Sequence, residues 1–107
     1  MQRGDVWWVN FDPSLGGEIR KIRPAVIISN DAANRNLSRV QVVPLTSKTG
    51  RLYPCEAYVE LNGQTSKAMA DQITSVSKQR LTRRIGTLSS DDMAGVDHVI
   101  RLQLALK

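Results

Sequence analysis

Two apolar runs decide the fold: Arg23-Pro24-Ala25-Val26-Ile27-Ile28-Ser29 and Val40-Gln41-Val42-Val43-Pro44-Leu45-Thr46-Ser47-Lys48. Both are short and rich in β-branched residues, which predicts strands over 24–29 and 39–46. The first strand follows a basic, glycine-containing loop, and the second ends in a hydroxyl-rich turn. If the two strands pair, the guanidinium of Arg23 and the hydroxyl of Thr46 share one edge of a sheet. Such a pair is suited to holding a phosphate group.

Further strands are indicated on both sides of these runs. Aromatic and β-branched residues predict a strand over 5–11, and alternation predicts a half-exposed strand over 55–61. Asn62-Gly63 is a strong hairpin signal, with residues 67–76 expected to return as a strand, and a last short strand is expected over 83–88. Residues 12–17 and 47–54 have the composition of loops, and 30–36 that of a short helical turn or loop.

The C-terminal part changes to a helical period. Ser89 is a good N-cap, with Asp92 three residues further on. An apolar stripe follows at helical spacing, formed by Met93, Val96, Ile100 and Leu104, with Val99 beside it. We therefore expect a mainly β fold with α: a small, strongly bent antiparallel sheet or barrel with one C-terminal helix, forming a single domain over residues 1–107.

Composition limits the class of protein. The chain has 107 residues, of which 41% are hydrophobic, enough for one core. Cys55 is the single cysteine, so no disulfide forms within the chain. No apolar run approaches the roughly 20 residues needed to cross a bilayer, and no signal segment follows Met1. These features predict a soluble, cytoplasmic protein that is not embedded in a membrane.

Positive charge is concentrated in one segment. The net charge is +5, and residues 18–51, with seven basic and two acidic residues, carry all of it. Such a segment favours a polyanionic partner, although a merely solvated surface has the same composition.

The usual nuclease groups are missing from the pattern. His98, the only histidine, lies off the apolar stripe of the helix and should face solvent. Cys55 has no histidine nearby in sequence, and a packing or surface role suits it. No carboxylate cluster, CxxC, HExxH, P-loop or GxGxxG pattern occurs, so neither a metal nor a cofactor is expected.

The remaining candidates each have a purely structural interpretation as well. Arg23 before a proline can simply be exposed, and Thr46 is a good strand residue. Asp71, with Gln72 in an expected strand, should find a partner because burying an unpaired carboxylate is costly. Trp7 and Trp8 should point to opposite faces of their strand, so that one packs in the core. The other is expected to be exposed, where it could stack a base, or to cover an interface.

An ordered series of short motifs runs through nearly the whole chain. Its members are Arg3-Gly4-Asp5-Val6-Trp7, Phe11-Asp12-Pro13, Gly17-Glu18, Arg23-Pro24-Ala25-Val26-Ile27-Ile28-Ser29, Val43-Pro44-Leu45-Thr46-Ser47, Ala70-Asp71-Gln72 and Arg84-Ile85-Gly86. This series closely resembles the MazF/PemK (Kid-like) toxins of toxin–antitoxin systems.

The resemblance implies an SH3-like barrel with a C-terminal helix that acts as a homodimer. It implies a metal-independent, sequence-specific endoribonuclease without cofactor, which cuts single-stranded RNA by attack of the 2′-hydroxyl and leaves a 2′,3′-cyclic phosphate and a 5′-hydroxyl. It also implies a cognate antitoxin whose acidic, flexible tail fills the RNA groove.

The resemblance also assigns roles to residues. Arg23 matches the catalytic arginine, which stabilises the charged transition state, and Thr46 matches the catalytic threonine, which holds the scissile phosphate. Glu18 is placed to orient Arg23 or to contact a base. The expected RNA-binding residues are Glu18, Arg20, Lys21, Ser47, Lys48, Arg51, Asp71 and Gln72.

Two positions depart from the PemK/Kid branch. Gly17 stands where that branch has a histidine, and Met69 where it has an arginine. The chain therefore follows the MazF branch, in which Arg23 and Thr46 form the pair.

Two other functions compete with this prediction. A gyrase poison of the CcdB type shares the fold but needs a Trp-Gly-Ile end, whereas this chain ends in Leu104-Ala105-Leu106-Lys107. A non-catalytic nucleic-acid-binding homologue is the second alternative, and the presence of both Arg23 and Thr46 argues against it.

Overall fold

Seven strands, two short 3-10 helices and two α-helices make up the part of the chain described by the computed structural model, residues 1–11 and 22–107. In chain order they are β1 (Asp5–Asn10), β2 (Ile22–Ile27), α1 (Asp31–Asn36), β3 (Arg39–Thr46), β4 (Glu56–Leu61), β5 (Gln64–Met69), η1 (Ala70–Gln72), β6 (Thr74–Ser77), η2 (Lys78–Arg80), β7 (Leu81–Thr87) and α2 (Ser90–Gln103). Apart from the one expected over 67–76, the strands lie close to the predicted ranges. The expected loop over 47–54 is confirmed, and the one expected over 12–17 lies outside the described residues.

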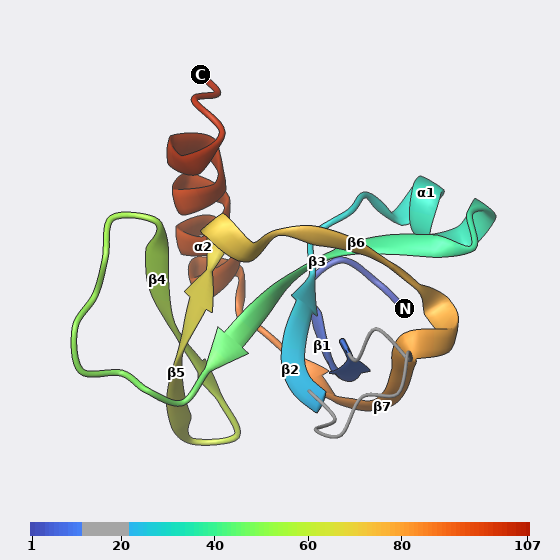
Figure 1. Cartoon of the computed structure of the whole chain (residues 1–107), viewed down its shortest axis with the longest axis horizontal. Helices are drawn as coiled ribbons and strands as arrows, with labels where there is room; N and C mark the ends of the chain where they lie inside the picture. The colour runs from blue at the N-terminus through green and yellow to red at the C-terminus, as the bar shows by residue number, and fades with distance from the viewer. Residues whose placement is uncertain (12–21) are drawn as a thin grey trace.

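The strands form one antiparallel sheet in the order β4-β5-β3-β2-β1-β7, and β6 also pairs with β3. The sheet bends strongly, so that β4 and β5 lie to one side of β3, while β1, β2 and β7 curl round on the other (Figure 1). Among the described residues no ladder joins β4 to β7. The predicted small antiparallel barrel with a C-terminal helix is therefore confirmed, as a half-barrel.

The prediction of one returning strand over 67–76 was wrong. The strand β5 begins at Gln64, directly after a turn in which Asn62 and Gly63 have φ values of 53° and 79°, as expected for this hairpin. It stops where its partner β4 begins, and the Ala70 N–H then donates to the Cys55 carbonyl at 3.0 Å. The chain turns through η1 and pairs as β6 with the first half of β3.

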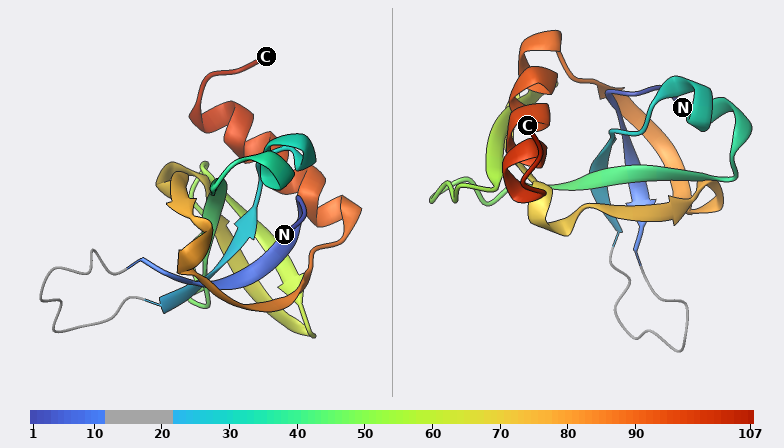
Figure 2. Two further views of the ribbon diagram at one scale, coloured as in Figure 1. Left: turned by 90° about the vertical axis from the view of Figure 1, so that its right-hand side faces the viewer. Right: turned by 90° about the horizontal axis from the view of Figure 1, so that it is seen from above.

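The C-terminal helix α2 starts as predicted. The Ser89 hydroxyl accepts a hydrogen bond from the Asp92 N–H at 3.1 Å, and the Asp92 carboxylate accepts one from the Glu60 N–H at 2.8 Å. The helix packs against β4 and η1 (Figure 2). His98 is exposed as expected, but Leu104 is also exposed because the helix ends at Gln103.

Two large apolar clusters fill most of the fold, and a small third one is formed by Ala57, Ala70 and Val99. One lies between α2 and the β3–β4–β5 part of the sheet and includes Leu45, Val59 and Val96. The other lies inside the curl of β1, β2, β3, β6 and β7 and includes Val9, Ile27 and Val40. Within the 24–29 run, residues 25–27 are completely buried. The start of β2 and the end of β3 reach the surface: Ile22 and Arg23 are exposed, and Thr46 is half-buried.

Candidate active site

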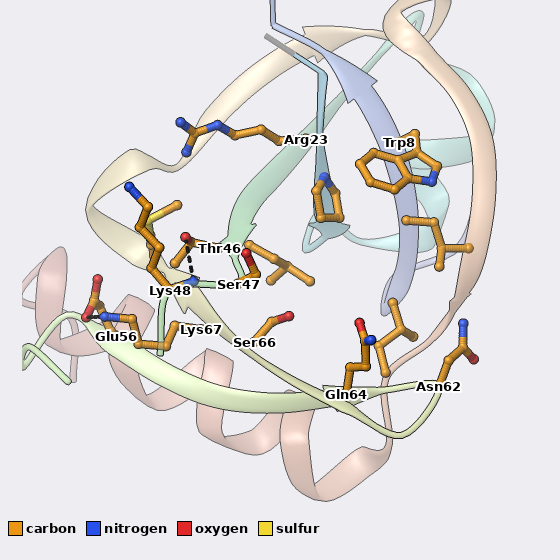
Figure 3. Close-up of a pocket in the computed structure, with 15 residues that line it drawn as sticks. Trp8, Arg23, Thr46, Ser47, Lys48, Glu56, Asn62, Gln64, Ser66 and Lys67 are labelled. Carbon is orange, nitrogen blue, oxygen red and sulfur yellow. Dashed lines mark hydrogen bonds and ion pairs between the residues drawn. The ribbon is translucent and has the colours of Figure 1, made fainter. Parts of the chain in front are cut away.

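A pocket of about 730 Å³ opens where β2, β3 and the β4–β5 hairpin meet. Its lining carries charged side chains and the Thr46 hydroxyl at one end, and an aromatic ring with two amides at the other (Figure 3). The lining residues are Trp8, Arg23, Pro24, Leu45, Thr46, Ser47, Lys48, Glu56, Leu61, Asn62, Gln64, Ser66, Lys67, Met69 and Ile85.

Strand register brings Arg23 and Thr46 together. The strands β2 and β3 are antiparallel, and the last pair of their ladder is Ala25 with Pro44. Two residues further along each strand, the same register places Arg23 opposite Thr46. Both side chains line the pocket. The expectation that the Arg23 guanidinium and the Thr46 hydroxyl share one edge of the sheet is therefore confirmed; this concerns their placement only.

The hydroxyl of Thr46 is held so that its hydrogen stays available. Thr46 is half-buried at the end of β3, and its Oγ1 accepts a hydrogen bond from the Lys48 N–H at 3.2 Å. A hydroxyl has one hydrogen to donate and two lone pairs that accept. The backbone contact uses one lone pair, so the O–H is free to donate to an anionic oxygen in the pocket.

Arg23 is exposed, and its side chain makes no hydrogen bond or ion pair to any residue in the described ranges 1–11 and 22–107, although its backbone belongs to the β1–β2 ladder. It also lines a smaller cavity of about 230 Å³ with Phe11, Pro44, Gln72 and Thr74. Its guanidinium thus lies between two hollows and keeps its donors for a ligand. Arginine remains charged at physiological pH and presents its donors in a planar fork that matches phosphate oxygens.

A buried ion pair that the sequence analysis did not identify forms part of the pocket wall. Lys67 Nζ lies 2.8 Å from Glu56 Oε1, and their side chains are only 7% and 10% exposed. Burial disfavours the charged form of Glu56, but the Lys67 ammonium and the Tyr53 N–H outweigh it and hold the pKa of Glu56 below its ordinary value. The sequence does contain a signal for this ion pair, the hairpin turn at 62–63. A two-residue turn there sets the register of β4 and β5, and this register makes Glu56 and Lys67 diagonal neighbours.

The opposite end of the pocket carries an aromatic ring and two amides. Trp8, paired with Pro24 across β1 and β2, faces Asn62 and Gln64 over the cavity (Figure 3). Trp7 instead packs against the core cluster of the curled sheet. The two tryptophans therefore point to opposite faces, as predicted.

Some predicted RNA-binding residues lie in this pocket and others do not. Ser47 and Lys48 line it and are exposed. Arg51 is not among its lining residues; its guanidinium carbon lies 5.0 Å from the centre of the Tyr53 ring. Gln72 borders only the smaller cavity beside Arg23. Glu18, Arg20 and Lys21 lie outside the described residues.

The expectation that Asp71 lies in a strand with a buried carboxylate was also wrong. It lies exposed in η1, where the chain leaves β5. Water solvates an exposed carboxylate, so no buried partner is needed. Asp71 lines a separate hollow of about 510 Å³ with half-buried Cys55. Burial, followed by the neighbouring Asp71 carboxylate, raises the pKa of the Cys55 thiol, which makes it a weaker nucleophile near neutral pH.

Metal-ligand clusters and membrane-spanning helices are both absent from the described part of the chain. Residues 1–11 and 22–107 contain no group of three or more histidine, cysteine, aspartate or glutamate side chains able to hold a metal ion. No helix in these ranges has the length and apolar character required to cross a membrane.

Comparison with known proteins gives the same family over almost the full length. Residues 2–104 match the model of the PemK-like, MazF-like toxins of type II toxin–antitoxin systems. The endoribonuclease MazF9 of Mycobacterium tuberculosis is 39% identical over 117 residues, covering 99% of this chain and 98% of the relative. The endoribonuclease EndoA of Bacillus subtilis is 30% identical over 112 residues, covering 99% and 96%.

Solved structures agree with the sequence relatives. A MazE–MazF complex from Deinococcus radiodurans has a TM-score of 0.85 at 27% identity, covering 100% of this chain and 97% of the other. A mycobacterial endoribonuclease in complex with its cognate antitoxin has the same TM-score at 25% identity, with the same coverage. The chain belongs to the family of PemK-like, MazF-like toxins of type II toxin–antitoxin systems.

Proposed function

We propose that this chain is an endoribonuclease toxin that cuts single-stranded RNA at specific sequences without a metal ion. The observation that carries the proposal is the placement of Arg23 and Thr46 opposite each other at the rim of one pocket, with Ser47 and Lys48 beside them. Relatives named as endoribonucleases support the reaction class.

In the proposed reaction, the 2′-oxygen of the RNA attacks the adjacent phosphorus, and the bond from phosphorus to the 5′-oxygen breaks. The products are a 2′,3′-cyclic phosphate and a 5′-hydroxyl. One proton leaves the 2′-hydroxyl and one is gained by the leaving 5′-oxygen, so protons balance. Arg23 stabilises the negative charge that builds on the phosphorane, and the Thr46 O–H donates to a phosphate oxygen.

The proposal includes partners. The net charge of +5 suits both RNA and an acidic antitoxin tail, and two similar solved structures are toxin–antitoxin complexes. Large apolar side chains are exposed near the end of α2 and in the loop after β3, including Leu102, Leu106 and Leu52. Exposed apolar side chains of this kind favour a homodimer or cover by the antitoxin.

The direct test is cleavage of a long single-stranded RNA in excess chelator, with both ends of the products identified. Wild-type protein should cut at a few sites and leave 5′-hydroxyl ends. Arg23→Ala should lower kcat by about 10² or more, as for loss of a donor aimed at developing charge, and Arg23→Lys should recover only part of the rate.

Arg101→Ala is the matched control. It removes an exposed arginine from α2, a helix that contributes no residue to the lining of the pocket. Cleavage that requires added metal, or that continues undiminished in Arg23→Ala, would rule out the mechanism. Binding without cleavage by the wild-type protein would favour a non-catalytic nucleic-acid-binding protein.

A further inference from the structure

The loop over residues 47–55, which leads away from Thr46 along the pocket, contains no helix or strand. It has no ladder hydrogen bonds to fix its path, so its position depends on individual contacts. Near its start, the Thr46 hydroxyl accepts a hydrogen bond from the Lys48 N–H at 3.2 Å, and the Thr49 carbonyl accepts one from the Tyr58 hydroxyl at 3.0 Å. At its end, the Cys55 carbonyl accepts a hydrogen bond from the Ala70 N–H at 3.0 Å. Between these ends, residues 51–53 are tied to the sheet through Glu56 and Lys67.

Glu56 and Lys67 hold the second half of this loop from beneath. Lys67 Nζ donates to the Arg51 carbonyl as well as to Glu56 Oε1. The same Glu56 oxygen accepts from the Tyr53 N–H at 3.0 Å, and the Glu56 N–H donates to the Tyr53 carbonyl at 2.9 Å. Lys67 Nζ also lies 5.7 Å from the centre of the Tyr53 ring.

The strand register places Lys67 in line with Thr46 and Arg23, the two residues proposed to act on RNA. Lys67 on β5 is the direct partner of Thr46 on β3, and Arg23 on β2 continues the row on the other side. Three neighbouring strands thus carry Arg23, Thr46 and Lys67 side by side along the pocket (Figure 3). A contact made by Lys67 fixes the loop relative to the hydroxyl that is proposed to hold the phosphate.

Stability alone is a weak reason for such a pair. A buried ion pair is often no more stable than apolar side chains of similar size, because both charges lose their hydration. Here the pair lies in the wall of the pocket, and both of its charges are used to fix backbone groups of the adjoining loop.

We propose that Lys67 and Glu56 are positioning residues that clamp the 47–55 loop beside the pocket and thereby set the affinity and the sequence choice for RNA. This inference rests on the proposed endoribonuclease function. It predicts that loosening the clamp affects RNA binding more than the chemical step, because Arg23 and Thr46 keep their own strands.

The test compares wild type with Lys67→Met, with the double variant Lys67→Met and Glu56→Gln, and with Lys107→Met. The double variant is needed because Lys67→Met alone leaves the Glu56 carboxylate buried without its partner. Lys107→Met removes the same charge from the exposed C-terminal residue. Steady-state cleavage and mapped cut sites are measured together with amide hydrogen exchange of the free proteins.

In the double variant, KM should rise about tenfold while kcat changes by less than about threefold, and cuts should appear at additional sequences. Amide exchange should become faster in peptides from 47–55 and stay unchanged in β1, β2 and β3. Lys107→Met should behave as wild type in every measurement.

Several results would overturn the inference. One is a double variant with wild-type KM, cut sites and loop exchange; another is a lower kcat with exchange accelerated throughout the protein, which indicates a role in stability alone. An inactive wild-type protein would instead refute the proposed function and, with it, the role in RNA choice. The exchange data would then still decide the clamp, and unchanged exchange in 47–55 would refute it.

Discussion

At the scale of single residues, the chemistry proposed for the pocket rests on one hydroxyl and one guanidinium. Thr46 Oγ1 accepts from the Lys48 N–H, so the hydroxyl both fastens the start of the loop and keeps its hydrogen for a ligand. Arg23 is exposed beside it. The lone pair that accepts from Lys48 thus helps to shape the pocket, while the Thr46 hydrogen and the Arg23 donors are left for the proposed reaction.

Replacing Thr46 tests this division of roles. Thr46→Val keeps the shape and the preference for a strand but removes the hydroxyl, so kcat for RNA cleavage should fall by about 10², the usual effect of losing one donor to a transition-state oxyanion. Thr46→Ser retains the hydroxyl and should stay within about tenfold of wild type.

Thr65→Val provides the control, since Thr65 is an exposed β5 residue outside the pocket lining. Rates are measured at saturating RNA. Equal rates for Thr46→Val and wild type would remove Thr46 from the reaction.

At the scale of elements, the first and last strands are joined by a buried carboxylate. Asp5 in β1 is 6% exposed; it accepts hydrogen bonds from the Gln2 N–H at 3.0 Å and the Thr87 hydroxyl at 2.9 Å, with Arg84 at 3.4 Å. Burial opposes the charge of Asp5, but these donors outweigh it and lower the pKa of Asp5 below its ordinary value.

The lowered pKa has a defined consequence for stability. A carboxyl group whose pKa is lower in the folded state contributes stability above its unfolded pKa and loses that contribution as the pH falls through the folded value. Asp5→Asn should therefore lower the free energy of unfolding by about 1–3 kcal/mol at pH 7. Below about pH 4 the variant should lose less stability with acid than wild type does.

Urea unfolding at a series of pH values measures both effects. Asp91→Asn is the matched control, because Asp91 is exposed in the first turn of α2, where its charge contributes at most about 1 kcal/mol. If Asp5→Asn and wild type have parallel acid profiles, the carboxylate does not contribute in the way that its contacts indicate.

At the scale of the whole molecule, the charge distribution determines how the protein meets a polyanion. The excess of +5 lies in residues 18–51, which include both strands that carry Arg23 and Thr46. A protein that contacts RNA phosphates with basic residues releases counterions, so its affinity decreases as salt increases.

The salt dependence of RNA affinity should therefore be steep. With a non-cleavable RNA that carries 2′-deoxyribose before the cut, log K should fall against log salt with a slope of about −0.7 for each phosphate contacted. Lys48→Gln should make the slope shallower by about one such step, because Lys48 lines the pocket and is exposed. A flat dependence would contradict the role assigned to the basic segment.

The sequence by itself determined those features that depend on neighbours along the chain. Asn62-Gly63 accepts the positive φ values of a tight hairpin, Ser89 caps the helix that follows it, and the apolar runs mark the buried strands. An antiparallel pair places the start of one strand beside the end of the other, so even the meeting of Arg23 and Thr46 could be anticipated from their places at the start of one run and the end of the next.

Only the tertiary structure decided how distant segments share edges and faces. The break after Met69 sends the chain along a second part of β3, which leaves Asp71 exposed and Gln72 beside a different cavity. Nothing local in the sequence shows that the charges of Glu56 and Lys67 are buried together, because burial depends on what packs above them. The chain alone therefore predicted that Arg23 and Thr46 lie together, whereas folding in three dimensions decided which residues form the walls around them.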